Sequence, residues 1–185
     1  MSWPNGCAAR RGVERDPDRA AIEVLFAECE SRLGRFLVQM VRDRSLAEDL
    51  LQDTFHDAFR ARSQLAGIPN PEPWLFGFAR NRALSALRRR RRGLTAVGRL
   101  AQRDGSRQYH DQELVVLRDL LERTLDPEER ALLLLRYLHG FDAAELATIV
   151  GSTPGAVRQR LSRSRQKLLA ASETHPLVKP SQEPI

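Results

Sequence analysis

Apolar positions repeat every three or four residues along most of the chain, a spacing typical of amphipathic helices. Apolar residues never alternate with polar ones over a useful length, so no strand is expected. The stretches with the helical period are 20–41, 46–62, 72–92, 114–121, 127–138, 142–150 and 154–170. The pattern therefore predicts an all-α protein.

Residues at the predicted helix ends support these boundaries. Ser45, with Glu48 three positions later, has the spacing of a capping box and predicts the start of the second helix. The third helix is expected to end at Gly93, because a glycine stop follows five arginines that suit the negative end of a helix dipole. The segment Asp126-Pro127-Glu128-Glu129 predicts a further helix start, with proline in the first turn.

The helical period of the apolar positions is lost in one segment, which divides the chain into two small helical domains. Residues 93–112 have no apolar stripe and gather glycine, serine and glutamine, so they are interpreted as a flexible linker between a 20–92 domain and a 113–170 domain. A linker of about 20 residues reaches up to about 66 Å, and two turns of duplex DNA measure about 70 Å. Residues 1–19 and 171–185 are interpreted as a disordered arm and tail.

The distribution of charge is more informative than the net charge of +6. Of the 30 cationic residues only Lys167 and Lys179 are lysines. Arginine suits phosphate and guanine edges, and a GC-rich genome also favours arginine codons; both causes stay open. Residues 80–107 carry ten arginines and one acid, residues 158–167 carry five cations and no acid, and residues 43–57 carry five acids and one arginine. Two basic surfaces and one acidic surface indicate a polyanion and a basic protein as partners.

Residues 142–168 have the plan of a helix-turn-helix, in which a short helix, a glycine-containing turn and a longer basic helix follow one another. Stepping 100° per residue places four positions of the last helix on its core face: Val157, Leu161, Ser164 and Leu168. The residues expected to meet base edges are Arg158, Gln159 and Ser162. Those expected to meet phosphates are Arg160, Arg163, Arg165 and Lys167.

Several function classes are not indicated by the sequence. Its four histidines are scattered, its two cysteines lack zinc-ligand spacing, and it has no G-x-x-x-x-G-K-[ST] loop. No metal, cofactor or enzyme activity is therefore expected. The chain has neither an apolar run of 18 residues nor a secretory signal, which predicts a cytoplasmic protein without membrane insertion.

Two groups of motifs resemble one protein family in the same order along the chain. Ala47–Phe55 (AEDLLQDTF) and Pro73–Asn81 (PWLFGFARN), with the arginine run behind them, resemble region 2 of the sigma-70 family in its extracytoplasmic-function (ECF) group. Region 4 of that group is resembled by LDPEER at 125–130, GSTPGAV at 151–157 and RLSRSR at 160–165. Together the two resemblances cover residues 20–92 and 113–170.

The resemblance implies an RNA polymerase sigma factor that gives the core enzyme promoter recognition and opens the promoter without nucleotide hydrolysis. It implies contacts with the clamp helices of the largest polymerase subunit, through Asp49, Leu50, Gln52 and Asp53, and with the flap region of the second-largest subunit. It implies binding of the minus 10 element through Arg62, Gln64, Asn70, Arg80, Asn81, Arg88 and Arg89. The minus 35 element would contact Thr153, Arg158, Gln159, Arg160, Ser162, Arg163 and Lys167. An anti-sigma factor is a further partner that the family suggests.

The sequence leaves an alternative function open. A helix-turn-helix repressor that dimerises through its N-terminal domain and binds palindromic duplex without polymerase is the alternative function. Asp49 and Gln52 are expected to be exposed, and Trp74 and Phe78 to pack in the core, whereas Phe76 is left undecided between core packing and base stacking. The chain departs from the family pattern at Ser85, where an acid is more usual, and at Ala156, where threonine is more usual.

Overall fold

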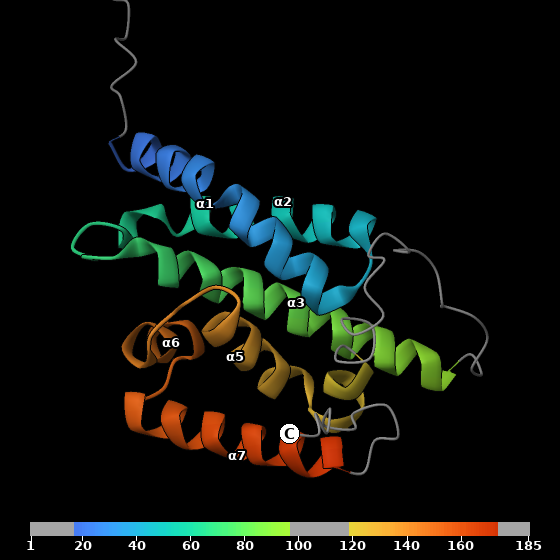
Figure 1. The fold of residues 1–185 in the computed structure, drawn as a ribbon. Helices are drawn as coiled ribbons and strands as arrows, with labels where there is room; N and C mark the ends of the chain where they lie inside the picture. The colour runs from blue at the N-terminus through green and yellow to red at the C-terminus, as the bar shows by residue number, and fades with distance from the viewer. Residues whose placement is uncertain (1–16, 97–118, 174–185) are drawn as a thin grey trace, which may run out of the picture.

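The protein is all-α, as its apolar pattern predicts (Figure 1). The computed structural model describes residues 17–96 and 119–173, and it has no strand within them. The helices whose bounds lie within the described residues are α1 (Pro17–Val41), α2 (Arg44–Arg60), the 3₁₀ turn η1 (Arg62–Gln64), α3 (Pro71–Ala96), α5 (Pro127–Tyr137), α6 (Ala143–Val150) and α7 (Pro154–Glu173). Residues 119–124 are helical as well. The predicted arm, linker and tail are each shorter than expected, because residues 17–19, 93–96 and 171–173 are helical in α1, α3 and α7. The rest of the three segments, 1–16, 97–112 and 174–185, lies outside the described residues.

The start of α2 differs from the prediction. Asp43, not Ser45, is the N-cap residue, and its Oδ1 accepts a hydrogen bond from the Leu46 amide at 3.0 Å. An N-cap residue needs extended backbone, and Asp43 has it at φ −138° and ψ 115° because Arg42 before it turns the chain at φ 57°. Glu48 closes no capping box and instead accepts from Arg44 Nε at 3.1 Å.

The end of α3 also differs, because the helix continues through Gly93 to Ala96. A helix-ending glycine takes a positive φ, as Gly151 does at φ 64° where α6 ends. Gly93 is not among the positive-φ glycines. A glycine inside a helix costs about 1 kcal/mol relative to alanine, so good helix formers around it can carry the helix past this position.

The starts of α5 and α6 are both closed by capping boxes. Asp126 accepts hydrogen bonds from the Glu128 and Glu129 amides, and the Glu129 carboxylate accepts from the Asp126 amide. Asp142 and Glu145 form the same arrangement at α6. These hydrogen bonds hold the pKa of the Asp142 carboxyl below its ordinary value. The predicted helix start at 126–129 is confirmed.

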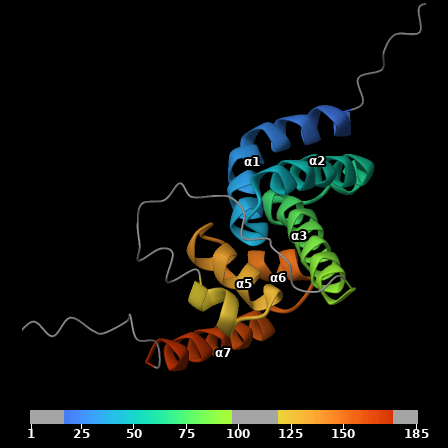
Figure 2. The ribbon, with the colours of Figure 1, turned by 90° about the vertical axis from the view of Figure 1, so that its right-hand side faces the viewer.

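The helices form two groups that pack on one another. Helices α1, α2 and α3 make the first group, and α5, α6 and α7 make the second (Figure 1). Turning the molecule shows α3 between α2 and the second group, with α7 on the side away from α1 and α2 (Figure 2). Helix α3 contacts α6 and α5, and α1 contacts α5.

An apolar seam joins the two groups. Phe76 of α3 is 0% exposed, with its ring centroid 5.9 Å from that of Phe36 and 4.8 Å from that of Phe141. Gly77 lies so close to α6 that a Cβ atom on it would be 3.5 Å from the Ile149 carbonyl oxygen. Sequence periodicity predicts two domains, and the structure shows that they share one continuous core.

His139 lies in this seam, between the rings of Phe36 and Phe76. Its Nε2 is 3.2 Å from Gln39 Oε1. Burial, with a smaller effect of the Arg32 and Arg35 charges, lowers the pKa of His139 from 6.5 to about 4. The folded protein therefore keeps this ring neutral where the unfolded chain would already protonate it.

Acid is expected to weaken the fold through His139. Between pH 6.5 and about 4 the unfolded chain binds the proton and the folded one does not, so the free energy of unfolding falls as the pH falls through this window. Urea titrations at pH 7.5 and 5 should show a loss in the native protein that exceeds the loss in His139→Gln by about 2 kcal/mol, because one proton is bound to the unfolded chain alone over about 1.5 pH units. Equal losses in the two proteins would contradict this prediction.

Candidate nucleic-acid interface

The outer face of α2 carries the acidic residues that the sequence analysis selected. Asp49 and Gln52 are exposed, as expected from the helical pattern. Leu50 is 2% exposed and packs in the core, so its side chain has no free surface for a partner. The structure therefore offers Asp49 and Gln52 for a protein contact and assigns Leu50 a packing role.

Two other acids of α2 are paired with one arginine of α3. Asp57 accepts two hydrogen bonds from Arg82, each of 2.6 Å, through its two carboxylate oxygens. Asp53 accepts a third from Arg82 at 3.2 Å. The Arg82 hydrogen bonds hold the pKa of the Asp57 carboxyl below its usual value. This pairing fixes α2 against α3 and neutralises part of the acidic face.

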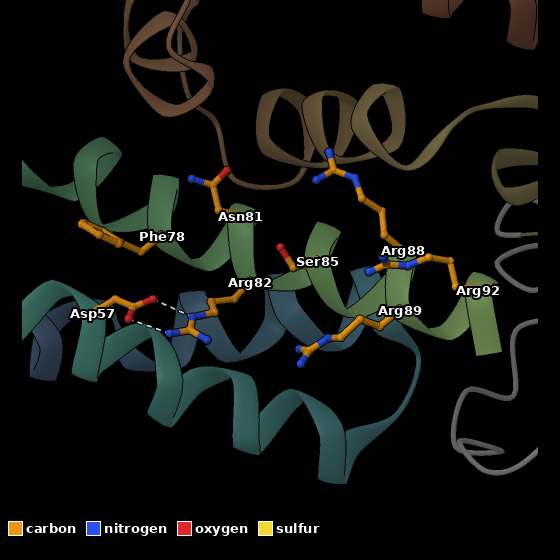
Figure 3. A pocket seen from close by; sticks show the side chains of 8 residues that line it. All are labelled: Asp57, Phe78, Asn81, Arg82, Ser85, Arg88, Arg89 and Arg92. Atoms are coloured by element: carbon orange, nitrogen blue, oxygen red, sulfur yellow. Dashed lines mark hydrogen bonds and ion pairs between the residues drawn. The ribbon is translucent and has the colours of Figure 1, made fainter.

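A cationic groove of about 540 Å³ runs along α3 beside this pair (Figure 3). Its exposed polar residues Asn81, Ser85, Arg88 and Arg89 follow one another at helical spacing. The full lining is Asp57, Phe78, Asn81, Arg82, Ser85, Arg88, Arg89 and Arg92. Guanidinium groups on an open surface can bind the phosphates of a single nucleic-acid strand, and an aromatic ring beside them can stack on a base.

Arg80 does not line the groove. It is 7% exposed, and its Nη2 is 3.7 Å from the Glu128 carboxylate of α5. Its Nη1 is 3.3 Å from Asn81 Oδ1, and its Nε is buried without a hydrogen-bond partner. Burial lowers the pKa of the Arg80 guanidinium. In this arrangement the second group of helices covers Arg80, one of the predicted minus 10 residues.

The turn and loop before α3 hold three more of the predicted minus 10 residues. Gln64 is exposed in η1. The Arg62 guanidinium lies 4.7 Å from the centre of the Phe59 ring and donates to the Phe59 carbonyl oxygen. Asn70 donates from its amide to Glu145 Oε1 at 3.0 Å, which connects this loop to α6. The structure does not bring these residues to the groove lining.

The aromatic residues of α3 have different environments. Phe76, which the sequence left undecided, is fully buried in the seam between the two groups. Trp74 and Phe78 are only half-buried, and their ring centroids are 4.8 Å apart in a T-shaped contact. Phe78 also lines the groove, so it is the aromatic side chain that can face a bound strand.

Helix α7 follows α6 through a tight turn and forms the predicted helix-turn-helix. Gly151 takes the left-handed conformation that ends α6, and Thr153 Oγ1 accepts from the Ala156 amide at 3.2 Å where α7 begins. Val157, Leu161 and Ser164 are buried, which confirms the predicted core face. A hydroxyl at Thr153 therefore caps the helix.

The outer face of α7 is polar and exposed. Arg158, Gln159, Ser162 and Arg163 are all exposed there. Arg160 and Lys167 point to the other flank, where Arg160 Nη2 lies 3.2 Å from Glu128 Oε2 and Lys167 pairs with Glu129. The outer face of α7 therefore presents four side chains to solvent, whereas Arg160 and Lys167 on the other flank are paired with acids of α5.

Five of the groove residues are not among the DNA-binding residues predicted from the sequence: Asp57, Phe78, Arg82, Ser85 and Arg92. A signal was available for Asp57, because Asp53 and Asp57 are four residues apart and so face the same side of α2. Nothing in the sequence, however, showed which arginine of α3 would meet them. Among the described residues no three histidine, cysteine, aspartate or glutamate side chains gather as a metal site. No described helix is long and apolar enough to cross a membrane.

A helix-turn-helix with a polar recognition face, combined with a second helical domain that carries a cationic groove, defines a DNA-binding protein. Comparison with known families specifies the class. Residues 25–93 match the family description "Sigma-70 region 2", and residues 114–168 match "Sigma-70, region 4".

Named relatives agree with the family matches. The chain is 35% identical to the RNA polymerase sigma factor CarQ of Myxococcus xanthus over 161 residues, which is 83% of this chain and 90% of CarQ. It is 31% identical to the ECF RNA polymerase sigma factor SigM of Bacillus subtilis over 153 residues, 80% of this chain and 93% of SigM. The chain therefore belongs to the sigma-70 family of RNA polymerase sigma factors, in its ECF group.

Solved structures share the fold. The sigma factor RpoE of Bartonella quintana, in complex with the anti-sigma factor NepR, superposes with a TM-score of 0.66 at 25% identity, over 83% of this chain and 97% of that one. CnrH, in complex with the cytosolic domain of CnrY, has a TM-score of 0.57 at 24% identity, over 84% of this chain and 89% of that one. The repressor alternative has no support among these matches.

Proposed function

We propose that this ECF sigma factor binds core RNA polymerase through Asp49 and Gln52 of α2 and directs it to promoters with two DNA-binding surfaces. The α3 groove would hold the opened minus 10 strand, and the outer face of α7 would enter the major groove at the minus 35 element. The chain would supply binding free energy for strand opening and carry out no catalysis. An anti-sigma factor is proposed as a further partner, because RpoE and CnrH were each solved with a protein partner.

The observation that carries this proposal is the outer face of α7. Arg158, Gln159, Ser162 and Arg163 are exposed together on a helix whose opposite face is anchored by buried Val157 and Leu161. Arginine and glutamine are the side chains that pair with guanine and adenine edges in the major groove. The second helix of a helix-turn-helix presents such residues to the bases.

Transcription from purified components tests the proposal. Core polymerase, the full chain and a library of genomic fragments should give initiation at a defined subset of fragments, and core polymerase alone should not. Phosphate contacts make this initiation sensitive to salt. If the chain adds no initiation on any fragment while remaining folded, the proposed function is wrong.

Arg158→Ala is expected to relax the base preference at one minus 35 position. If Arg158 forms a bidentate contact with guanine, the loss at that position is about 1–3 kcal/mol. Initiation on promoter variants changed at one base at a time measures the effect. Arg165→Ala is the matched control, because Arg165 is also exposed on α7 but was assigned to phosphate contact. An equal loss across all promoter variants would assign Arg158 to phosphate contact as well.

A further inference from the structure

The side chains that α3 contributes to its groove change in chemistry from one end to the other. They follow one another along the groove in the order Phe78, Asn81, Ser85, Arg88, Arg89 and Arg92, with Arg82 beside them (Figure 3). A helix rises about 1.5 Å per residue, so the last three arginines occupy about 6 Å of the helix axis, and Phe78 lies about 15 Å before them. The groove therefore has an aromatic end at Phe78 and an arginine end at residues 88–92.

Uncompensated positive charge is concentrated at the arginine end. At the aromatic end Asp57 lines the groove, and Arg82 donates two hydrogen bonds of 2.6 Å to its carboxylate, so one guanidinium cancels this acid. At the other end Arg88 Nη2 lies 3.0 Å from Glu128 Oε1. Arg89 has no acidic partner among the described residues. An anion in the groove is therefore drawn to the arginine end.

This order of chemical groups matches the order of groups in one nucleotide. The Phe78 ring can stack on a base, and the exposed Ser85 hydroxyl can exchange a hydrogen bond with a sugar hydroxyl. The guanidinium groups can donate charge-assisted hydrogen bonds to phosphate oxygens. The groove volume of about 540 Å³ lies in the range of small-molecule sites, about 300–1,000 Å³.

Asn81 favours a purine as the base. Its Oδ1 accepts a hydrogen bond from Arg80 Nη1 at 3.3 Å, which leaves the Asn81 amide nitrogen as a donor toward a ligand. Adenine and guanine both carry an acceptor, N7, on the edge of the base, and pyrimidines lack it. A purine can therefore stack on Phe78 and accept from Asn81 together.

A free nucleotide with several phosphates uses the arginine end more fully than a strand does. A strand carries one phosphate charge for each nucleotide. A triphosphate joins three phosphates directly to one another behind a single base. Clustered guanidinium groups beyond one aromatic ring therefore suit the free polyphosphate as well as one unit of a strand.

We propose that the α3 groove is a binding site for a purine nucleoside 5′-polyphosphate, with the base on Phe78 and the phosphates at the arginine end. A nucleotide bound there excludes the minus 10 strand from the same side chains. The level of free nucleotide would then set how readily the chain takes up that strand. This regulatory consequence rests on the proposed function, whereas the nucleotide site itself does not.

The base end is tested by isothermal titration calorimetry of the full, free chain with ATP and with inorganic tripolyphosphate, in a buffer without divalent cations. Because stacking of a base on an aromatic ring contributes about fivefold or more to affinity, Phe78→Ala should weaken ATP binding by that factor and leave tripolyphosphate binding unchanged. Phe78→Tyr keeps the ring and should keep native ATP affinity. UTP should bind more weakly than ATP, and Asn81→Ala should reduce this difference.

Arg89→Gln tests the phosphate end. A hydrogen bond to a charged group contributes about tenfold or more, so this variant should weaken both ATP and tripolyphosphate by about that factor. Arg91→Gln is the matched control, because Arg91 is exposed on the same helix, does not line the groove and loses the same charge. It should change either affinity by less than about twofold.

Competition with a strand is the third measurement. Fluorescence anisotropy of a labelled, mixed-sequence, 12-nucleotide single-stranded DNA reports its binding to the native chain. ATP should release this oligonucleotide at the concentrations at which calorimetry shows ATP to bind. If ATP binds and the oligonucleotide stays bound, the exclusion of the strand is wrong.

The other outcomes separate the nucleotide site from the proposed function. If ATP does not bind, if Phe78→Ala weakens ATP and tripolyphosphate equally, or if Arg91→Gln acts as Arg89→Gln does, the nucleotide site is wrong and the groove is at most a general anion surface. If ATP binds as expected while the native chain supports no initiation with core polymerase, the nucleotide site stands and the proposed function fails. Thermal melting checks that each variant is folded.

Discussion

A chain that carries Asp49→Arg and Gln52→Ala is expected to bind core RNA polymerase much more weakly than the native chain does. Both side chains are exposed on α2, so the substitutions leave the core packing untouched. An arginine in place of an acid at a contact with a basic partner replaces attraction by repulsion, which costs several kcal/mol in an interface. Affinity measured by pull-down or by surface-immobilised polymerase should fall at least about thirtyfold.

The matched control for this variant is Glu30→Arg with Ser31→Ala. Both positions are exposed on α1, and the pair makes the same change of charge. It should keep native affinity, and circular dichroism of both variants should keep its helical signal. If the α2 variant still binds polymerase with native affinity, the contact lies elsewhere on the chain. If the variant loses its helical circular dichroism signal, the assignment of Asp49 and Gln52 as exposed is wrong.

Phe76→Ala is expected to cause the largest loss of stability. The ring is 0% exposed and contacts Phe36 of the first domain and Phe141 of the second, so its removal leaves a cavity at the seam. Buried phenylalanine replaced by alanine costs about 3–5 kcal/mol. Urea unfolding measures this change.

The control for Phe76→Ala is Val24→Ala, because Val24 is 58% exposed on α1 and should change stability by less than about 0.5 kcal/mol. Both domains should lose stability together in Phe76→Ala, since the ring packs on residues of each. A loss confined to the first domain, seen as two separate unfolding transitions, would show that the seam does not couple the domains.

The helices were predictable because each buries one apolar stripe. Val157, Leu161 and Ser164 could be assigned to the core face of α7 from spacing alone, and the structure buries all three. The ends were less predictable. Ser45 has the expected chemistry of a cap, but only backbone conformation selects Asp43, and that depends on the turn at Arg42.

The docking of the two domains could not be predicted from periodicity. An apolar stripe shows that one face of a helix is buried but not which element covers it. The pattern therefore does not decide between core packing and base stacking for Phe76, and it does not single out Phe141. For the same reason Arg80 was expected to be available to DNA, like the exposed Arg88 and Arg89. A charged side chain in an arginine-rich helix is usually exposed, and here a helix more than 40 residues away in sequence covers it.

The bidentate pair of Asp57 and Arg82 makes the two ends of the α3 groove different in charge. One end holds this neutralised pair and the Phe78 ring, and the other end holds Arg88, Arg89 and Arg92 (Figure 3). The positive potential of the cationic end attracts the phosphates of a strand. The Phe78 ring at the other end offers an aromatic surface on which a base can stack. A strand in this groove would therefore turn its phosphates toward Arg88, Arg89 and Arg92 and a base toward the Phe78 ring.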